Sequence, residues 1–294
     1  MGIKFLNRDK TLTPQQIGKF RTTRPFDYKF PAGLAGEPPV LSPMDYLIVA
    51  GGGGGGTHND ARYPAGGGGG GGYRIGSGYY LTQAQTWTVV VGAGGLAYPA
   101  QPSTGDFRGT NGANSGIYIP GTSAIWSTGG GGGGGPSQPG FAGGSGGGGG
   151  NNGAPGGAGN AGGYTPSEGN NGGGAVDLYT SGGGGGAGGV GGTPFTGGLG
   201  LNNTISGSSV YYSYGASGGT EPGIAGNTNT GGGGTGGGVA PSLGRNGGSG
   251  IVILRYASPQ IATGGTITNV TGNVIHTFTG DGFFNVVTAG YSVN

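Results

Sequence analysis

Cysteine is absent from the 294-residue sequence, charged residues make up only 7 % of it, and histidine occurs twice. Without cysteine the chain has no disulfide framework and no cysteine-based metal site. Its longest apolar runs, such as residues 46–50, are far shorter than the ~18 residues that cross a membrane. The first nine residues contain no apolar stretch of the kind found in signal peptides. We therefore expect synthesis in the cytoplasm, no membrane insertion, and release by a route such as lysis.

Catalytic motifs are also scarce. The pattern Gly-x-Ser-x-Gly occurs twice, but a sequence this rich in glycine produces it by chance. His58 and Asp60 could share a metal ion, although no third ligand stands near them in the sequence. Glu168 and Asp177 are the nearest carboxylates to each other in the body of the chain, and nothing indicates that they face each other as glycosidase chemistry requires. We expect no enzyme activity, no cofactor and no metal.

Glycine accounts for 87 of the 294 residues, about 30 %, against roughly 7 % in ordinary proteins. Residues 51–250 hold 77 of these glycines. Collagen is excluded, because collagen has glycine only at every third position, with proline-rich positions between. A flexible linker stays open as an alternative, since polyglycine is a random coil unless something holds it. The main tracts lie at residues 51–56, 66–72, 129–135, 146–150, 182–186, 231–234 and 236–238.

Two features favour an ordered glycine-rich body. Apolar runs rich in β-branched and aromatic residues border the tracts at residues 44–50, 86–91 and 250–256, which is typical of buried strands. The longest tracts also recur at five to seven residues. Polyglycine II segments have three residues per turn and rise ~3.1 Å per residue, and without Cβ atoms neighbouring backbones can pack closely and hydrogen-bond. The predicted fold is mostly β and irregular: a sandwich of packed polyglycine II segments capped by short β-strands, with an extended N-terminal arm.

The N-terminal part differs in composition. The first 30 residues carry seven basic and two acidic groups, a net charge of 7 − 2 = +5, and the remainder carries 5 − 8 = −3. Aromatic residues interleaved with the cations favour a docking peptide that orders on a partner protein; nucleic acid is the alternative that a basic segment suggests, and we do not favour it. Residues 31–45 contain four prolines and predict an extended linker. The expected docking residues are Phe5, Arg8, Phe20, Arg21, Arg24 and Phe26.

Side chains that recognise a ligand must lie in the connections between glycine segments. Loops of Tyr, Ser, Gly and Asn on a rigid scaffold are typical of adaptable recognition surfaces. The alternative is that the tyrosines only cover the edges of the glycine lattice. We favour this covering role for Tyr73, Tyr79 and Tyr80, which lie beside a predicted strand. The predicted receptor-binding residues are Tyr211, Tyr212, Tyr214, His58, Asp60 and Tyr63. Both interpretations stay open for Tyr211, Tyr212 and Tyr214, and a solvated loop is the alternative for His58 and Asp60.

Three stretches occur in a distinctive order. The run YLIVA at residues 46–50 enters the first tract, TVVVGAGG follows at residues 88–95, and GGSGIVILRY closes the body at residues 247–256. This order resembles the glycine-rich domain of bacteriophage tail-fibre and other virion proteins, over roughly residues 44–256. The tract architecture is also similar to the distal adhesins of T-even-like phages, whose glycine-rich motifs form a sandwich of polyglycine II helices. The basic aromatic arm and the C-terminal strands depart from those adhesins.

The resemblance implies a non-enzymatic virion protein: a tail-fibre adhesin that is extracellular after lysis and binds a glycan or outer-membrane protein of the host through loops at one end of the sandwich. Residues 1–43 would dock it onto another virion protein, residues 44–256 form the glycine-rich domain, and residues 257–294 form a small C-terminal β-element. A trimer follows only by analogy with fibres. The alternative is a capsid or tail decoration subunit with no receptor. An enzyme acting on surface polysaccharide is disfavoured, because no acid/base pair is evident.

Overall fold

The structure is a computed structural model that describes residues 43–58, 63–81, 85–97, 107–119, 121–219, 223–238 and 243–287. All of them belong to Leu41–Asn294, the larger of the two compact units into which the chain divides. Strands and irregular segments make up this part of the chain, and it contains no helix, which confirms the predicted fold class. The residues predicted for docking, and Asp60 of the predicted receptor site, lie outside the described residues: Phe5, Arg8, Phe20, Arg21, Arg24, Phe26 and Asp60.

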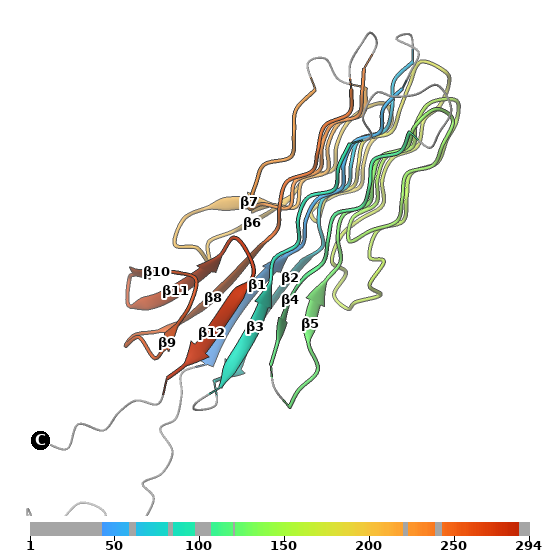
Figure 1. Cartoon of the computed structure of the whole chain (residues 1–294). Coiled ribbons are helices and arrows are strands. Elements are labelled where there is room, and N and C mark those ends of the chain that lie inside the picture. Colours follow the sequence, from blue (N-terminus) through green and yellow to red (C-terminus); the bar gives the residue numbers. More distant parts are fainter. Residues whose placement is uncertain are drawn as a thin grey trace, which may run out of the picture. The chain divides into compact units, whose positions relative to one another are not determined.

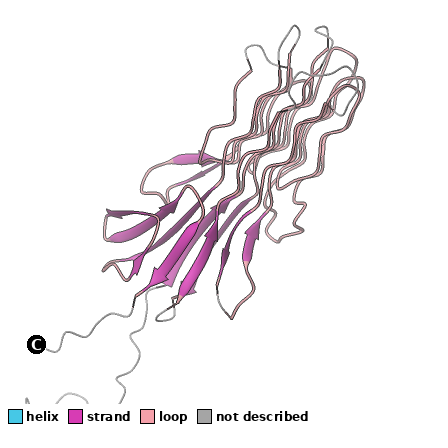
Figure 2. Cartoon of the chain, in the orientation of Figure 1, coloured by secondary structure: helices cyan, strands magenta, loops and turns pink. Residues whose placement is uncertain are grey.

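The strands gather at one end of the unit, and glycine-rich segments continue from them toward the other end (Figures 1 and 2). The strand bounds are β1 (Pro43–Val49), β2 (Tyr73–Tyr80), β3 (Thr86–Val90), β4 (Ser115–Tyr118), β5 (Ile125–Ser127), β6 (Leu201–Asn203), β7 (Val210–Tyr212), β8 (Ile251–Ala257), β9 (Ala262–Thr263), β10 (Thr266–Val270), β11 (Asn273–Phe278) and β12 (Gly282–Val286). They form a sheet of order β10-β11-β8-β1-β2, a second of order β5-β4-β3-β12-β9, and the hairpin β6-β7.

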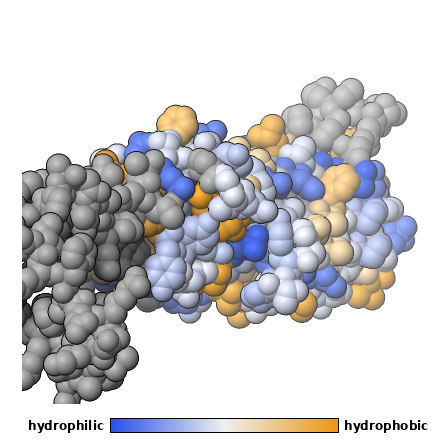
Figure 3. All heavy atoms as spheres, turned by 90° about the horizontal axis from the view of Figure 1, so that it is seen from below, coloured by the Kyte–Doolittle hydropathy of each residue, from blue (hydrophilic) through white to orange (hydrophobic). Residues whose placement is uncertain are grey.

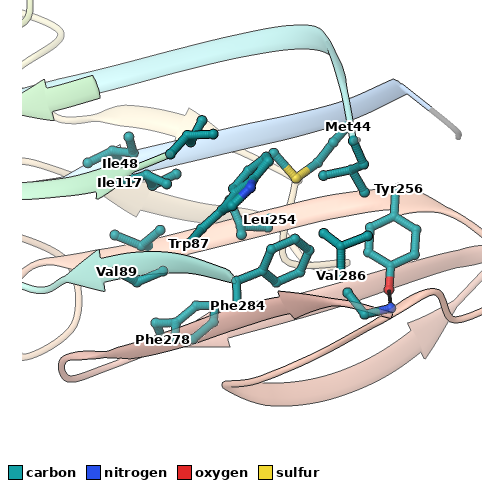
Figure 4. Close-up of a cluster of buried hydrophobic side chains, with 14 of the residues drawn as sticks. Met44, Ile48, Trp87, Val89, Ile117, Leu254, Tyr256, Phe278, Phe284 and Val286 are labelled. Atoms are coloured by element: carbon teal, nitrogen blue, oxygen red, sulfur yellow. Dashed lines mark hydrogen bonds between the residues drawn. The ribbon is translucent and has the colours of Figure 1, made fainter. Parts of the chain in front are cut away.

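The two five-stranded sheets enclose the main hydrophobic core (Figure 4). Met44 and Ile48 of β1 meet Trp87, Leu254 and Phe284 there, and all five side chains are buried. The ring centroids of Trp87 and Phe284 are 5.3 Å apart. The buried strands predicted from the apolar runs bordering the tracts are thus present as β1, β3 and β8.

A second core lies on the opposite face of β1. Leu47 and Val49 point to this side and pack with Ile253, while Ile205 and Tyr212 come from the region of the β6-β7 hairpin. Because β1 is buried on both faces, its sequence is a nearly continuous apolar run rather than an alternation of polar and apolar residues.

A buried histidine links β8 to the turn between β9 and β10 through hydrogen bonds. His276 of β11 is fully buried, and its Nε2 lies 2.9 Å from the hydroxyl of Tyr256. Its Nδ1 lies 2.7 Å from the carbonyl oxygen of Gly264, and the Tyr256 hydroxyl accepts the N–H of Ala262 at 3.1 Å. This geometry suits a neutral imidazole that donates from Nδ1 and accepts at Nε2. Burial lowers the pKa of His276 from its ordinary value of 6.5, partly offset by the Gly264 hydrogen bond.

The lowered pKa of His276 predicts a loss of stability in mild acid. Below pH 6.5 the unfolded chain binds a proton at this residue while the folded chain stays neutral, so the free energy of unfolding falls by up to about 1.4 kcal/mol per pH unit until the folded pKa is reached. Urea unfolding at pH 7.5 and 5.5 measures this slope. We expect the free energy of unfolding to change less with pH in His276→Gln than in His58→Gln. Equal changes in the two variants would contradict the assignment of the pH dependence to His276.

The glycine segments form the predicted lattice. Successive amides of segment 51–56 donate to three different neighbours in turn: Gly51 to Ala113, Gly52 to Gly248 and Gly53 to Gly69, before the same order repeats at residues 54–56. A repeat of three residues is that of polyglycine II. The carbonyl oxygens of segment 51–56 accept hydrogen bonds from the amides of three further segments, so segment 51–56 is enclosed on all sides. The segments bonded to it are 66–72, 92–97, 107–114, 129–135, 231–238 and 243–250.

Segments at the edge of the lattice differ from the enclosed ones. Residues 51–56 and 66–72 are wholly buried and wholly glycine. In segment 107–114 glycine occupies only positions 109 and 112, three residues apart, and the other positions carry side chains. The side-chain oxygens of Asn111 and Asn114 accept the amides of segment 129–135 at 2.9 Å, in place of a further polyglycine segment. In this segment glycine therefore occupies the two positions at which a Cβ would overlap a neighbouring backbone, that of Gly54 for Gly109 and that of Gly51 for Gly112.

The C-terminal residues, predicted as a small β-element, supply β9 to β12 to the two five-stranded sheets. Strand β11 pairs with β8, and β12 pairs with β3 of the second sheet. Both sheets that cap the glycine lattice are therefore completed by residues after 257, and the two regions share one hydrophobic core. The glycine-rich composition ends at β8, and strand pairing continues beyond it.

Candidate recognition surfaces

Aromatic side chains meet at the end of the lattice that lies away from the strands. The ring centroids of His58 and Tyr63 are 5.4 Å apart, and those of Tyr63 and Tyr179 are 5.9 Å apart. Tyr63 and Tyr179 precede segments 66–72 and 182–186 in the sequence. These two segments are neighbours, because the amide of Gly67 donates to the carbonyl oxygen of Gly182. The side chain of Tyr179 is 68 % exposed, while His58 and Tyr63 are partly buried. We call His58, Tyr63 and Tyr179 the distal aromatic cluster.

The loop that carries Tyr179 is held by polar contacts rather than by its ring. Buried Asn151 accepts the amide of Ser137 at 2.8 Å and donates to the carbonyl oxygen of Leu178 at 3.3 Å. The carboxylate of Asp177 accepts the amide of Tyr179 at 2.9 Å. Because these bonds involve only main-chain atoms of the 178–179 segment, the Tyr179 ring is free to serve as a contact surface. Nothing in the sequence indicates that Tyr179 meets Tyr63.

The predicted tyrosines of strand β7 and the residues after it separate into two kinds. Tyr211 and Tyr214 are 51 % and 37 % exposed, and their ring centroids are 5.7 Å apart. Tyr212 is only 2 % exposed and belongs to the second core, where burial raises its pKa above 10.0. The prediction of Tyr212 as a receptor contact is therefore corrected: alternation along β7 turns its side chain inward.

The tyrosines for which a covering role was favoured lie in β2. Tyr73 is buried in the second core, and its hydroxyl accepts from Asn203 at 2.7 Å. Tyr79 packs edge-on against Trp87 with centroids 5.5 Å apart. Tyr80, in contrast, is exposed. Two of the three, Tyr73 and Tyr79, therefore pack with the hydrophobic cores, whereas the interpretation from the sequence was that they cover the edges of the lattice.

The two sets of predicted receptor residues lie at opposite ends of the lattice. Tyr63 precedes segment 66–72, and Tyr73, which packs in the same core as Tyr212, follows it. Seven residues at ~3.1 Å each separate these ends by roughly 20 Å. The predicted residues that the structure describes therefore form two separate aromatic groups: the distal aromatic cluster and the exposed pair Tyr211 and Tyr214.

The carboxylates considered for catalysis do not face each other. Glu168 is 1 % exposed at the strand end of the lattice, where its Oε2 accepts the amide of Thr128 at 2.9 Å. Asp177 lies in the loop at the other end. In the described ranges no group of three potential ligands of the His, Cys, Asp and Glu types is placed to hold a metal ion.

A polar pocket beside the hairpin was missed by sequence reasoning. Asp45 of β1 and Arg255 of β8 are direct partners in the sheet, with Oδ2 and Nη2 2.7 Å apart. They line a pocket of about 450 Å³ together with residues 75–77 and 203–205. The sequence feature that could have indicated this pocket is the single charged residue inside each of two otherwise apolar strands.

Hydrophobic residues do not form one large patch on the face that Figure 3 shows, where they stand as separate spots among hydrophilic ones. Among the residues that the structure describes, there is no helix with the length and apolar character needed to cross a membrane.

The fold and these surfaces define a glycine-lattice protein capped by two β-sheets. The family described as "Glycine-rich domain" matches residues 24–257, which is most of the chain, and the protein belongs to that family. No curated protein and no solved structure matches the chain.

Proposed function

We propose that this protein is a bacteriophage virion protein, a tail-fibre adhesin that attaches to the host cell surface through the distal aromatic cluster. The observation that carries the proposal is the meeting of Tyr63 and Tyr179, from loops more than a hundred residues apart, at one end of a buried lattice. Exposed aromatic rings are the residues that most often dominate binding energy at interfaces. The order of the apolar runs and tracts, which resembles that of phage tail-fibre proteins, also supports it.

The lattice gives such a surface a physical advantage. Loops that are already held in place lose little conformational freedom when they bind, so more of the contact energy appears as affinity. The bonds from Asn151 to Ser137 and Leu178 hold the Tyr179 loop in this way. The receptor chemistry that fits aromatic and hydroxyl groups is a host glycan or an exposed loop of an outer-membrane protein.

The remaining parts of the proposal concern assembly. The N-terminal 43 residues, basic and rich in aromatic residues, would dock the protein onto another virion protein. The protein would then be made in the host cytoplasm, be carried on the tail or fibre, and become extracellular on lysis. A homotrimer would fit a fibre position.

The proposal predicts that particles with Tyr63→Ala and Tyr179→Ala adsorb to their host at least about tenfold more slowly. Loss of dominant aromatic contacts typically costs about 2 kcal/mol or more, and 1.4 kcal/mol corresponds to a factor of ten. Adsorption rate constants of purified particles measure the effect, and gel analysis of those particles confirms incorporation of the variant. The matched control is Tyr211→Ala with Tyr214→Ala, two tyrosines in contact at the other end.

The purely structural alternative, a decoration or fibre subunit with no receptor, predicts normal adsorption for both double variants. A defect confined to the Tyr211 and Tyr214 variant would instead move the receptor site to the hairpin. Either outcome overturns the assignment to the distal cluster.

A further inference from the structure

The pocket beside the β6-β7 hairpin has a charged floor. Asp45 and Arg255 lie opposite each other on β1 and β8, and about one third of each side chain is exposed. The bond between them joins Oδ2 to Nη2, and within the described ranges Oδ1 of Asp45 has no hydrogen-bond partner. One carboxylate oxygen and several guanidinium N–H groups therefore remain able to bond to a ligand.

The wall formed by β2 departs from regular pairing at this point. Met44 pairs with Tyr79 and Tyr46 with Gly76, so Ser77 and Gly78 together oppose the single residue Asp45. Such bulges change the direction of side chains and are frequent beside binding sites. The bulge leaves Ser77 at the pocket rim, and its hydroxyl forms no hydrogen bond inside the described part of the chain.

The opposite wall is rigid. Asn203 donates to the hydroxyl of Tyr73 at 2.7 Å and accepts the amide of Ile205 at 2.7 Å. Thr204 between them is exposed and lines the pocket. Ile75 lines it from β2 and is 52 % exposed, which supplies one apolar surface among the polar groups. The volume of about 450 Å³ lies within the roughly 300–1,000 Å³ of small-molecule sites.

We propose that this pocket binds one neutral sugar residue, and that it is a second site separate from the distal aromatic cluster. The Asp45 and Arg255 charges cancel, so the floor does not favour an anion or a cation. A pair of neighbouring hydroxyls on a pyranose ring matches it, because one hydroxyl accepts from the guanidinium and the next donates to the carboxylate. The hydroxyls of Ser77 and Thr204 serve further ring hydroxyls, and Ile75 covers the C–H face of the ring.

The test uses the full chain and a panel of methyl glycosides of glucose, galactose, mannose and N-acetylglucosamine, with the methyl glycoside of sialic acid as an anionic comparison. Saturation-transfer NMR detects binding, and we expect at least one neutral glycoside to bind with a Kd on the order of 1–10 mM. Asp45→Asn should weaken that binding at least about tenfold, since it removes the negative charge of the acceptor and replaces one of the two carboxylate oxygens with an NH2 donor. Asp177→Asn, at the other end of the lattice, should bind as the natural protein does.

A second variant keeps the test valid if Asp45→Asn fails to fold. Ser77→Trp leaves the ion pair in place and fills the pocket from an exposed strand position, so it should abolish binding while urea unfolding stays unchanged. The proposal is overturned when no neutral glycoside binds, when only the sialic acid glycoside binds, or when Asp45→Asn and Ser77→Trp bind as tightly as the natural protein. None of these results depends on whether the distal cluster binds a receptor.

Discussion

Replacing Gly53 with alanine is expected to lower the free energy of unfolding by about 3 kcal/mol or more, the upper end of the range for overpacking a core. A Cβ on Gly53 would overlap the carbonyl oxygen of Gly131 in the neighbouring segment. In an ordinary core a side chain can rotate away from an inserted methyl group. Here the obstacle is backbone, and Gly53 is itself bonded to Gly69 at 2.8 Å and to Gly234 at 2.9 Å.

The destabilisation should extend beyond one contact. To admit the methyl group, segment 129–135 would have to move away, and its own bonds to residues 51, 54, 66 and 69 run through the same interface. Urea unfolding followed by circular dichroism or tyrosine fluorescence measures the free energy change. We expect a lower midpoint with a similar m-value, since the folded lattice is retained at low urea.

Gly189→Ala is the matched control for Gly53→Ala. A Cβ there would have Leu199 as its nearest neighbour at 3.5 Å, which is an ordinary contact. Alanine at a compatible position restricts the unfolded chain and stabilises by about 0.4–1 kcal/mol. Equal effects of the two substitutions would show that the glycines are not required for close backbone packing, and the rigid platform behind the proposed adhesin would then lose its basis.

Replacing Glu168 with alanine is expected to cost about 3–5 kcal/mol of stability, the sum for two or three buried donors that lose their acceptor. The side chain is 1 % exposed and its Oε2 accepts the amide of Thr128 at 2.9 Å and the hydroxyl of Ser127 at 3.4 Å. Its Oε1 accepts the amide of Gly162 at 3.2 Å. The main-chain oxygen of Glu168 also accepts the amide of Tyr73 at 2.8 Å, where β2 leaves the lattice.

Glu168 thus satisfies backbone donors at the junction where glycine segments become strands. Alanine would leave those donors buried without an acceptor, and each such group costs about 1–3 kcal/mol. Thermal and urea unfolding of Glu168→Ala measure the loss. The matched control is Asp177→Ala, an exposed carboxylate that accepts one amide, that of Tyr179; its loss should cost no more than about 1 kcal/mol. A normal unfolding midpoint in Glu168→Ala would refute this structural role.

Much of the architecture followed from the sequence. An unbroken glycine tract bordered by an apolar run can be buried only by packing backbone on backbone, so residues 44–56 already indicated a strand that continues into the lattice. The same logic placed side chains in the connections between glycine segments, including the one that contains Tyr63; recognition there stays a prediction. The apolar runs of β1, β3 and β8 identified these three strands, because β1 and β8 are buried over most of their length and β3 turns Trp87 and Val89 into the core.

The sequence could not determine which segments become neighbours. Polyglycine segments all present the same surface, so no local pattern tells residues 51–56 to bond to 66–72 and 107–114. Strand pairing and the loops between segments decide it.

For the same reason the contact of Tyr63 with Tyr179, the burial of Tyr212 and Glu168, and the pairing of Asp45 with Arg255 emerged only in the tertiary structure. Each depends on residues from distant parts of the chain. The amino-acid sequence therefore indicated a glycine lattice and the position of the three apolar strands that border its tracts, β1, β3 and β8. The tertiary structure alone decided which side chains meet, because a backbone without side chains carries no information about its partner.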